Sequence, residues 1–453
     1  MLSYFKDFVP FVLYAALLGV SLVAVFKRAQ WALYLLVVLV PLPALWYPLH
    51  ELPLGKDTMD VLLASAVLGA LVNKGGLEAP NGSGIVWFFV LVSFCALLNV
   101  LVTFDLNLDT GWSFISNWKN FFEMTVLYFI VYSVIKNEDQ QKIVLTILAI
   151  VFLMIAVRAF RNFSAGNAFS YDKRSGGPFD MVGLGPNHFA AFIVHYGALL
   201  LGMWLVDTNR WRRWLYLAAV LFGLHPLFFA YSRGAYAALM AVLLVYGLLR
   251  NRWFLVAIAI FAFTWDSVLP DTVIERITMT SNSDGQLEES AALRVVLWEQ
   301  AKQVFRDNPV FGIGFFGFEY LMRGNELKNT HNYFVQVAAE EGVIGLFAIM
   351  LLFLRGYWVG WNLYRRGTSA FQSGLGLGFV GCITAVIVTN IFGDRFTQFS
   401  LGAYFFIVFG MVERAYASCR HSPLSAPLDV MPLAVVSSSA PLASPSGQAK
   451  EGR

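Results

Sequence analysis

The sequence predicts an all-α polytopic membrane protein, and three observations lead to this prediction. Of the 453 residues, 58% are hydrophobic and only 13% are charged, whereas soluble domains carry roughly 25% charged residues. Aromatic residues make up 16%, which is typical of helices that face acyl chains and carry Trp and Tyr at the interfaces. Apolar runs of about 20 residues, the length that crosses the hydrocarbon, recur along the chain. We therefore expect one membrane domain and a lipid bilayer as its surroundings.

These apolar runs predict 12–13 transmembrane helices, because two of the runs are short. In chain order they are 8–26, 31–49, 58–73 (short), 84–103, 120–135, 143–160, 188–206, 214–231, 235–249 (short), 253–270, 333–354, 373–392 and 398–413. The first run is interpreted as a retained span, because no small-residue cleavage site follows it.

The distribution of Lys and Arg predicts the orientation, since cytoplasmic loops carry the excess of positive charge. Alternate loops hold most of the cations: Lys27, Arg28, Lys74, Lys136, Lys142, Arg210, Arg212, Arg213, Arg250, Arg252, Arg355, Arg365, Arg366 and Arg414. Assigning that set to the cytoplasm places two long connections, 161–187 and 271–332, on the outer side. The same assignment places the N-terminus outside.

The connection 271–332 is too long to be a simple linker. Apolar residues recur in it at helical spacing and predict an amphipathic surface helix over Glu288–Arg306; they are Leu293, Leu297, Ala301, Val304 and Phe305. The membrane domain is expected to span 1–415, including this extracytoplasmic loop. Residues 416–453, rich in Ser, Pro and Ala, predict a disordered cytoplasmic tail.

Several classes of function are disfavoured. A net charge of +3 without a basic stripe gives no indication of nucleic acid binding. The three cysteines are widely separated, so no disulfide framework or thiolate metal site is expected. The sequence contains no Walker loop, no dinucleotide-binding glycine pattern and no HExxH. No cofactor and no metal are therefore predicted.

Ionisable residues at membrane depth usually mark a function or a buried pair. Arg233, in Tyr231-Ser232-Arg233-Gly234, joins two apolar runs on the predicted outer side; it fits an anion site, or a side chain that extends to lipid headgroups. Arg294 lies one helical turn before Trp298, which also fits a solvated face with a cation–π contact.

The strongest local signal is Thr330-His331-Asn332-Tyr333, followed by Glu341-Gly342. Thr330 or Asn332 can cap a helix, and Gly342 can break it. A lone His is often structural, but here two arginines share its side of the membrane. His can accept a proton near neutral pH, and Arg offers a fork of donors to phosphate. One base together with two arginines that bind phosphate oxygens fits the transfer of a group from a phosphorylated donor to a hydroxyl, with a pyrophosphate leaving group.

The chain resembles the superfamily of O-antigen ligases and polymerases. His331-Asn332, nine residues and Gly342-Val343-Ile344-Gly345 are similar to the ligase signature of His, Asn, nine positions and Gly-x-x-Gly. Three further segments resemble the family in the same order: Ser232-Arg233-Gly234, Arg294 with Trp298, and Asn308-Pro309-Val310-Phe311-Gly312-Ile313-Gly314.

The resemblance implies a GT-C-like membrane glycosyltransferase that takes a glycan from undecaprenyl pyrophosphate and transfers it to an acceptor hydroxyl on lipid A core, protein or another glycan. It implies a metal-independent, inverting reaction at the periplasmic face of the bacterial inner membrane. His331 would be the base, and Arg233 and Arg294 would bind the pyrophosphate. Asn332 and Trp298 are further substrate-binding candidates.

Asn187, in Gly185-Pro186-Asn187-His188, and Arg395, in Gly393-Asp394-Arg395, also lie on the predicted outer side. Both are candidates for substrate binding, and ordinary helix-end roles are the alternative. A polymerase of the same superfamily stays open as a function. A secondary transporter is the alternative from another class, although no internal repeat is evident. A structural protein of the envelope is a third possibility.

Overall fold

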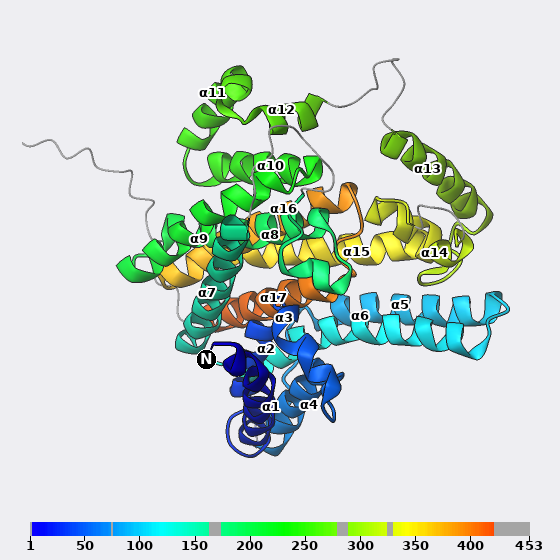
Figure 1. The fold of residues 1–453 in the computed structure, drawn as a ribbon, viewed down its shortest axis with the longest axis horizontal. Helices are drawn as coiled ribbons and strands as arrows, with labels where there is room; N and C mark the ends of the chain where they lie inside the picture. Colours follow the sequence, from blue (N-terminus) through cyan, green and yellow to red (C-terminus); the bar gives the residue numbers. More distant parts are fainter. Residues whose placement is uncertain (1, 74–75, 163–173, 279–288, 324–328, 421–453) are drawn as a thin grey trace, which may run out of the picture.

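The computed structural model describes residues 2–73, 76–162, 174–278, 289–323 and 329–420, and within these ranges the regular structure is helical (Figure 1). The first half contains α1 (Leu2–Phe26), α2 (Gln30–Leu39), α3 (Pro43–Trp46), η1 (Tyr47–Glu51), α4 (Thr58–Val72), α5 (Ser83–Thr103), α6 (Leu108–Val134), α7 (Glu138–Asn162), η3 (Gly177–Val182) and α8 (Pro186–Val206). The second half contains α9 (Arg210–Phe229), α10 (Arg233–Leu249), α11 (Trp253–Val268), α12 (Asp271–Thr278), α13 (Glu289–Asp307), α14 (Gly317–Leu321), α15 (Tyr333–Arg366), α16 (Ala370–Ile391) and α17 (Phe399–Arg420). The predicted all-α polytopic fold is confirmed.

The number of spans differs from the prediction. Among the described residues, six helices are long and apolar enough to cross a membrane, or up to eight if each bent pair of helices is one span. Residues 31–49, predicted as one span, form α2 and the pair α3 and η1, with a bend of 107° between them. The chain turns by 110° between α11 and α12 in the same way. Counting apolar residues cannot detect such bends, because composition does not record direction.

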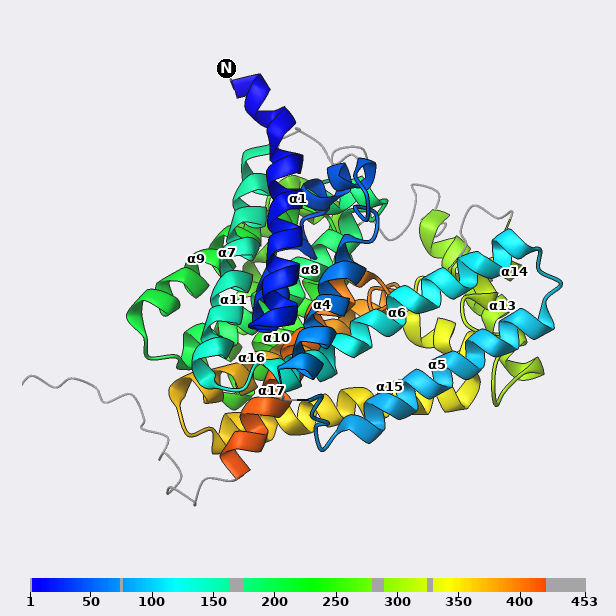
Figure 2. The same ribbon diagram turned by 90° about the horizontal axis from the view of Figure 1, so that it is seen from below.

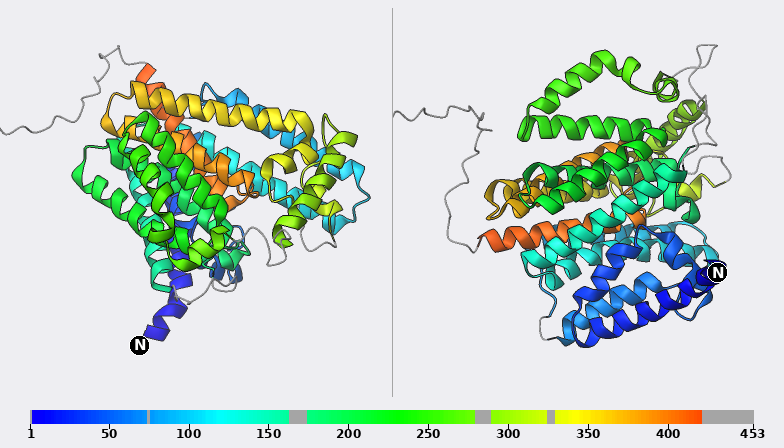
Figure 3. Two further views of the ribbon diagram at one scale, coloured as in Figure 1. Left: turned by 90° about the horizontal axis from the view of Figure 1, so that it is seen from above. Right: turned by 60° about the vertical axis from the view of Figure 1, so that its left-hand side comes forward.

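The core is built around α16, which packs against α8, α10 and α15. Small residues allow the closest approach: a Cβ added to Gly202 of α8 would lie 2.4 Å from the Cα atom of Gly378 in α16. Such contacts are a usual means of helix association in lipid. Figure 3 shows the N-terminal helices α1 and α4 on one side of this core and α11 and α12 on the opposite side. In Figure 2, α5 runs beside α15, with which it is in contact.

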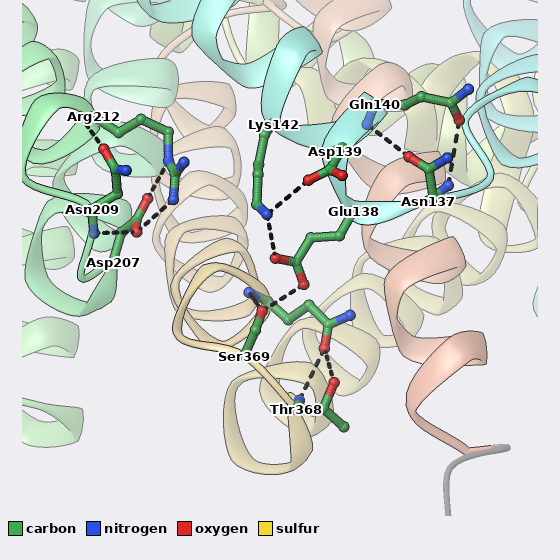
Figure 4. Close-up of polar contacts among 11 residues, drawn as sticks. Asn137, Glu138, Asp139, Gln140, Lys142, Asp207, Asn209, Arg212, Thr368 and Ser369 are labelled. Atoms are coloured by element: carbon green, nitrogen blue, oxygen red, sulfur yellow. Dashed lines mark hydrogen bonds and ion pairs between the residues drawn. The ribbon is translucent and has the colours of Figure 1, made fainter.

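Five cations of the predicted cytoplasmic set pair with acidic side chains on the same or on neighbouring segments. Figure 4 shows Lys142 of α7 pointing to Glu138, to which Ser369 donates a hydrogen bond from the α15–α16 connection. The other pairs are Lys136 and Arg414 with Glu78, Arg212 with Asp207, and Arg355 with Glu413. Several of the loops that the charge pattern grouped together are therefore joined by contacts in the folded chain.

The helix α15 is broken at Gly342, as the sequence suggested. Gly342 has φ 65° and ψ −160°, which a residue with a side chain rarely adopts. The segment 309–315 fills the break: the amides of Ile313 and Gly314 donate to the carbonyls of Ala339 and Glu340, at 3.0 and 2.8 Å. The amide of Val343 donates to the carbonyl of Pro309 at 2.9 Å. The backbone groups released by the kink are thus paired, as a membrane requires.

Two predicted boundaries can be compared with the structure. The amphipathic helix predicted over Glu288–Arg306 is α13, Glu289–Asp307, and it packs through Leu297 and Ala301 against α15. The predicted tail begins too early, because α17 continues to Arg420 and so includes residues 416–420. The rest of the predicted tail lies outside the described residues.

Candidate functional site

His331 lies in the connection that leads into α15, and its backbone is strained. Its φ angle is 50°, in the left-handed region that few residues other than glycine occupy. Two contacts hold it there: the His331 amide donates to the side-chain oxygen of Asn329 at 3.1 Å, and Asn332 caps the helix directly after it. Such strain costs about 1–3 kcal/mol and is common at functional sites.

The surroundings of His331 keep its imidazole neutral. Burial, and then the positive charges of Arg294 and Arg395, lower the pKa of His331 to about 4. The ring is therefore a proton acceptor at neutral pH, although a weak base while no anion is present. A negatively charged ligand between the arginines would raise this pKa by opposing their charges.

Arg294 reaches the site from α13. One turn later on the same helix, the indole N–H of Trp298 donates to the carbonyl oxygen of Thr330 at 2.7 Å. Because residues four apart share a face of a helix, this bond turns the Arg294 face of α13 towards the loop of His331. Trp298, predicted as a substrate-binding residue, thus has a structural contact that positions Arg294.

Arg395 lies in the short connection between α16 and α17. Its side chain is buried, and its Nη1 atom lies 2.9 Å from Nε2 of His188 at the start of α8. Burial lowers the pKa of Arg395 to about 10, with Arg294 and Arg174 acting in the same direction and Asp394 opposing them. The guanidinium therefore keeps its charge at neutral pH, beside His331 and Arg294.

Arg174 is a site residue that sequence reasoning missed. Its Nη2 donates to the side-chain oxygen of Asn187 at 2.7 Å, and its Nε donates to the carbonyl of Ala230 at 3.0 Å. Arg276, which is buried, donates to the carbonyl of Tyr231. Two arginines thus donate hydrogen bonds to carbonyls of the turn between α9 and α10. The sequence feature that could have indicated Arg174 is its position two residues before Gly176-Gly177, in the first long connection on the predicted outer side.

Arg233 begins α10 directly after this turn. A Cβ added to Gly234 would lie 2.7 Å from the Cβ atom of Phe392, which ends α16. The start of α10 therefore packs against the segment that leads to Arg395. Arg233 thus belongs to the same end of the molecule as the other arginines.

The structure brings most of the predicted residues together, with some changes of role. His331, Arg294 and Arg395 are electrostatically coupled. Asn332 and Asn187 each use the side-chain oxygen within the protein: Asn332 accepts from the amides of Phe334 and Val335, and Asn187 accepts from Arg174. His188 was the second residue missed; it directly follows Asn187, and its contact with Arg395 spans almost half of the chain.

The arrangement can bind an anion and accept a proton. The guanidinium groups of Arg294 and Arg395 act on a neutral His331. Arg174 acts in turn on Arg395, and Arg174 and Arg276 both donate to the turn between α9 and α10. Arginine forks match the geometry of phosphate oxygens. Among the residues that the structure describes, no three His, Cys, Asp or Glu side chains are grouped so as to hold a metal ion; metal independence stays a prediction.

Comparison with known proteins adds one finding. Residues 218–350 match a family model described as O-antigen ligase. The match includes Arg233, Arg294, His331 and the break at Gly342, and it ends before Arg395. A search of curated proteins found no match.

Proposed function

We propose that the chain belongs to the O-antigen ligase-like superfamily, whose family model matches residues 218–350, and that it transfers a glycan from undecaprenyl pyrophosphate to an acceptor hydroxyl. The reaction takes place at the periplasmic face of the bacterial inner membrane. It needs no metal and inverts the configuration at the anomeric carbon. The acceptor is a lipid, protein or glycan hydroxyl.

One observation carries this proposal: a neutral, strained His331 lies within the electrostatic reach of Arg294 and Arg395. A secondary transporter would instead be expected to place its ionisable groups near the midplane of a broken helix. The cluster lies at helix ends, in the connections before α15 and after α16. A base under the influence of two arginines fits group transfer from a pyrophosphate donor better than transport.

The chemical steps follow from these roles. A ring nitrogen of His331 accepts the proton of the acceptor hydroxyl, while its oxygen attacks the anomeric carbon. The bond between that carbon and the pyrophosphate oxygen breaks, and the electron pair leaves with the pyrophosphate. Arg294, Arg395 and Arg233 bind the negative charge that develops there. Donor binding also raises the pKa of His331, so that the base becomes stronger when the donor is in place.

The test is glycan transfer by purified protein in nanodiscs, supplied with an undecaprenyl-pyrophosphate glycan and with lipid, glycan or peptide acceptors. We expect a discrete product that depends on the acceptor and is lost in His331→Ala. His225→Ala is the matched control, because that His packs against Phe160 within the helical region. A ladder of lengthening glycan without added acceptor would indicate a polymerase. Absence of transfer to every acceptor, or full activity of His331→Ala, would contradict the proposal.

A further inference from the structure

A groove of about 540 Å³ lies between α5 and the break in α15, and the site described above does not use it. Its wall is formed by α5 from Leu91 to Val102, by Phe311, and by Glu341 and Ile344 of α15. All of the lining side chains are apolar or weakly polar except Asn99 and Glu341. The volume lies within the range of ligand-binding pockets, roughly 300–1,000 Å³.

The groove opens towards the bilayer. On α5, the side chains of Leu91, Leu98 and Val102 are 57%, 47% and 86% exposed. In a membrane-spanning helix, exposed apolar side chains of this kind are covered by lipid chains. Hydrocarbon can therefore enter the groove laterally from the membrane.

Glu341 gives the groove one unusual chemical feature. This side chain is only 7% exposed, yet its carboxyl group forms no hydrogen bond or ion pair with any residue in the described ranges. Its neighbour Glu340 differs, because it accepts hydrogen bonds from Gln336 and from the amide of Phe318, both at 3.3 Å. The amide of Asn99 is also occupied, since it donates to the carbonyl of Gly312. Glu341 lines the groove. A carboxyl group that faces acyl chains without a hydrogen bond is costly, so a donor inside the groove would stabilise it.

We propose that this groove binds the acyl chain of a lipid acceptor, and that Glu341 hydrogen-bonds a hydroxyl or amide N–H at the junction of chain and headgroup. The inference rests on the proposed function and narrows its acceptor to a membrane lipid. An isoprenoid chain would fill the groove but would offer no partner to Glu341, because it carries no hydrogen-bonding group.

The position of Glu341 agrees with this assignment. Asn99, which lines the same groove, lies four residues before the outer end of α5, about 6 Å along a helix. That depth suits the junction between acyl chains and headgroup. His331 lies ten residues before Glu341, which corresponds to roughly 15 Å along a helix. A lipid whose sugar headgroup extends over roughly 15 Å could present a hydroxyl to His331 while its acyl chain stays in the groove.

Cys95 supplies a natural reporter, because it is exposed and lines the groove. The experiment uses the full chain with Cys419→Ser in nanodiscs of an ether-linked phosphatidylcholine, which has no hydrogen-bond donor. The rate at which N-ethylmaleimide alkylates Cys95 is measured with and without an added N-acylglucosamine lipid. Cys382 is buried and serves as an internal control for unfolding.

We expect the N-acylglucosamine lipid to slow the alkylation of Cys95 severalfold. Protection should persist in Glu341→Gln, which can still hydrogen-bond, and should be lost in Glu341→Leu, which is apolar and of similar size. The proposal would be overturned if the lipid did not change the alkylation rate of Cys95 in the protein that retains Glu341. It would also be overturned if the lipid protected Cys95 equally well in Glu341→Leu. Transfer to a water-soluble acceptor is measured in parallel. Transfer without protection rejects only the groove, whereas protection without transfer to any acceptor rejects the proposed function.

Discussion

The Nη1 atom of Arg395 lies 2.9 Å from Nε2 of His188. A guanidinium group can only donate, so Nε2 of His188 must accept. The proton of this neutral imidazole is therefore on Nδ1. The contact joins the start of α8 to the connection after α16, and it holds the Arg395 fork in place beside His331.

His188 is accordingly expected to act as a positioning residue. In His188→Leu the guanidinium loses its acceptor, and we expect KM for the donor to rise roughly tenfold, the equivalent of about 1.4 kcal/mol. His188→Gln, whose amide oxygen can accept, should retain most of the affinity. Steady-state kinetics with varied donor will separate KM from kcat. A large fall in kcat with unchanged KM would contradict the positioning role.

The pKa of His331 predicts the pH dependence. Since burial and two arginines lower this pKa to about 4, the free enzyme keeps its base deprotonated through the neutral range. The value of kcat/KM should therefore fall only as pH drops towards about 4. In the donor complex the pyrophosphate charge opposes the arginines, so the acid limb of kcat should lie at higher pH. A limb of kcat/KM near the ordinary His value of about 6.5 would argue against this environment.

Replacing the arginines by lysine tests whether the fork geometry matters. Arg294→Lys, Arg395→Lys and Arg233→Lys keep the charge but lose the paired donors. We expect each change to lower kcat/KM roughly 10- to 100-fold, as for the loss of a charged hydrogen bond. Lys302→Ala is the control, because Lys302 pairs with exposed Glu299 on the same helix as Arg294. Variants with full activity and normal expression would remove the corresponding residue from the site.

The kink in α15 should be intolerant of a side chain. A Cβ at Gly342 would lie 2.3 Å from the carbonyl oxygen of Val310, at a φ of 65°. Gly342→Ala is expected to lower the free energy of unfolding by about 2 kcal/mol or more. Gly84→Ala is a suitable control, since nothing lies within 4 Å of its added Cβ. Thermal unfolding in detergent will compare the two variants, and equal midpoints would show that the kink tolerates a side chain.

Much of the site was predictable because it depends on local chemistry. The cap at Asn332 and the break at Gly342 follow from residue types and short spacing, and the structure contains both. The roles of Asn187 and Trp298 were harder to predict, because each contacts a partner, Arg174 or Thr330, in the same long connection, and spacing along an irregular segment does not show which residues meet. The bend after α2 was missed for a similar reason: an apolar run predicts burial in lipid but does not predict direction.

Composition and apolar run length by themselves determined that the chain is a helical membrane protein, since excess apolar surface must face lipid. Residue order also determined the candidates His331, Arg233 and Arg294. Only the tertiary structure decided that Arg395 joins His331 and Arg294, that His188 holds Arg395, and that Glu341 lines a groove between α5 and α15. These relationships depend on helices that are remote in sequence, and their side chains meet only when the packing of α5, α8, α13, α15 and α16 brings them together.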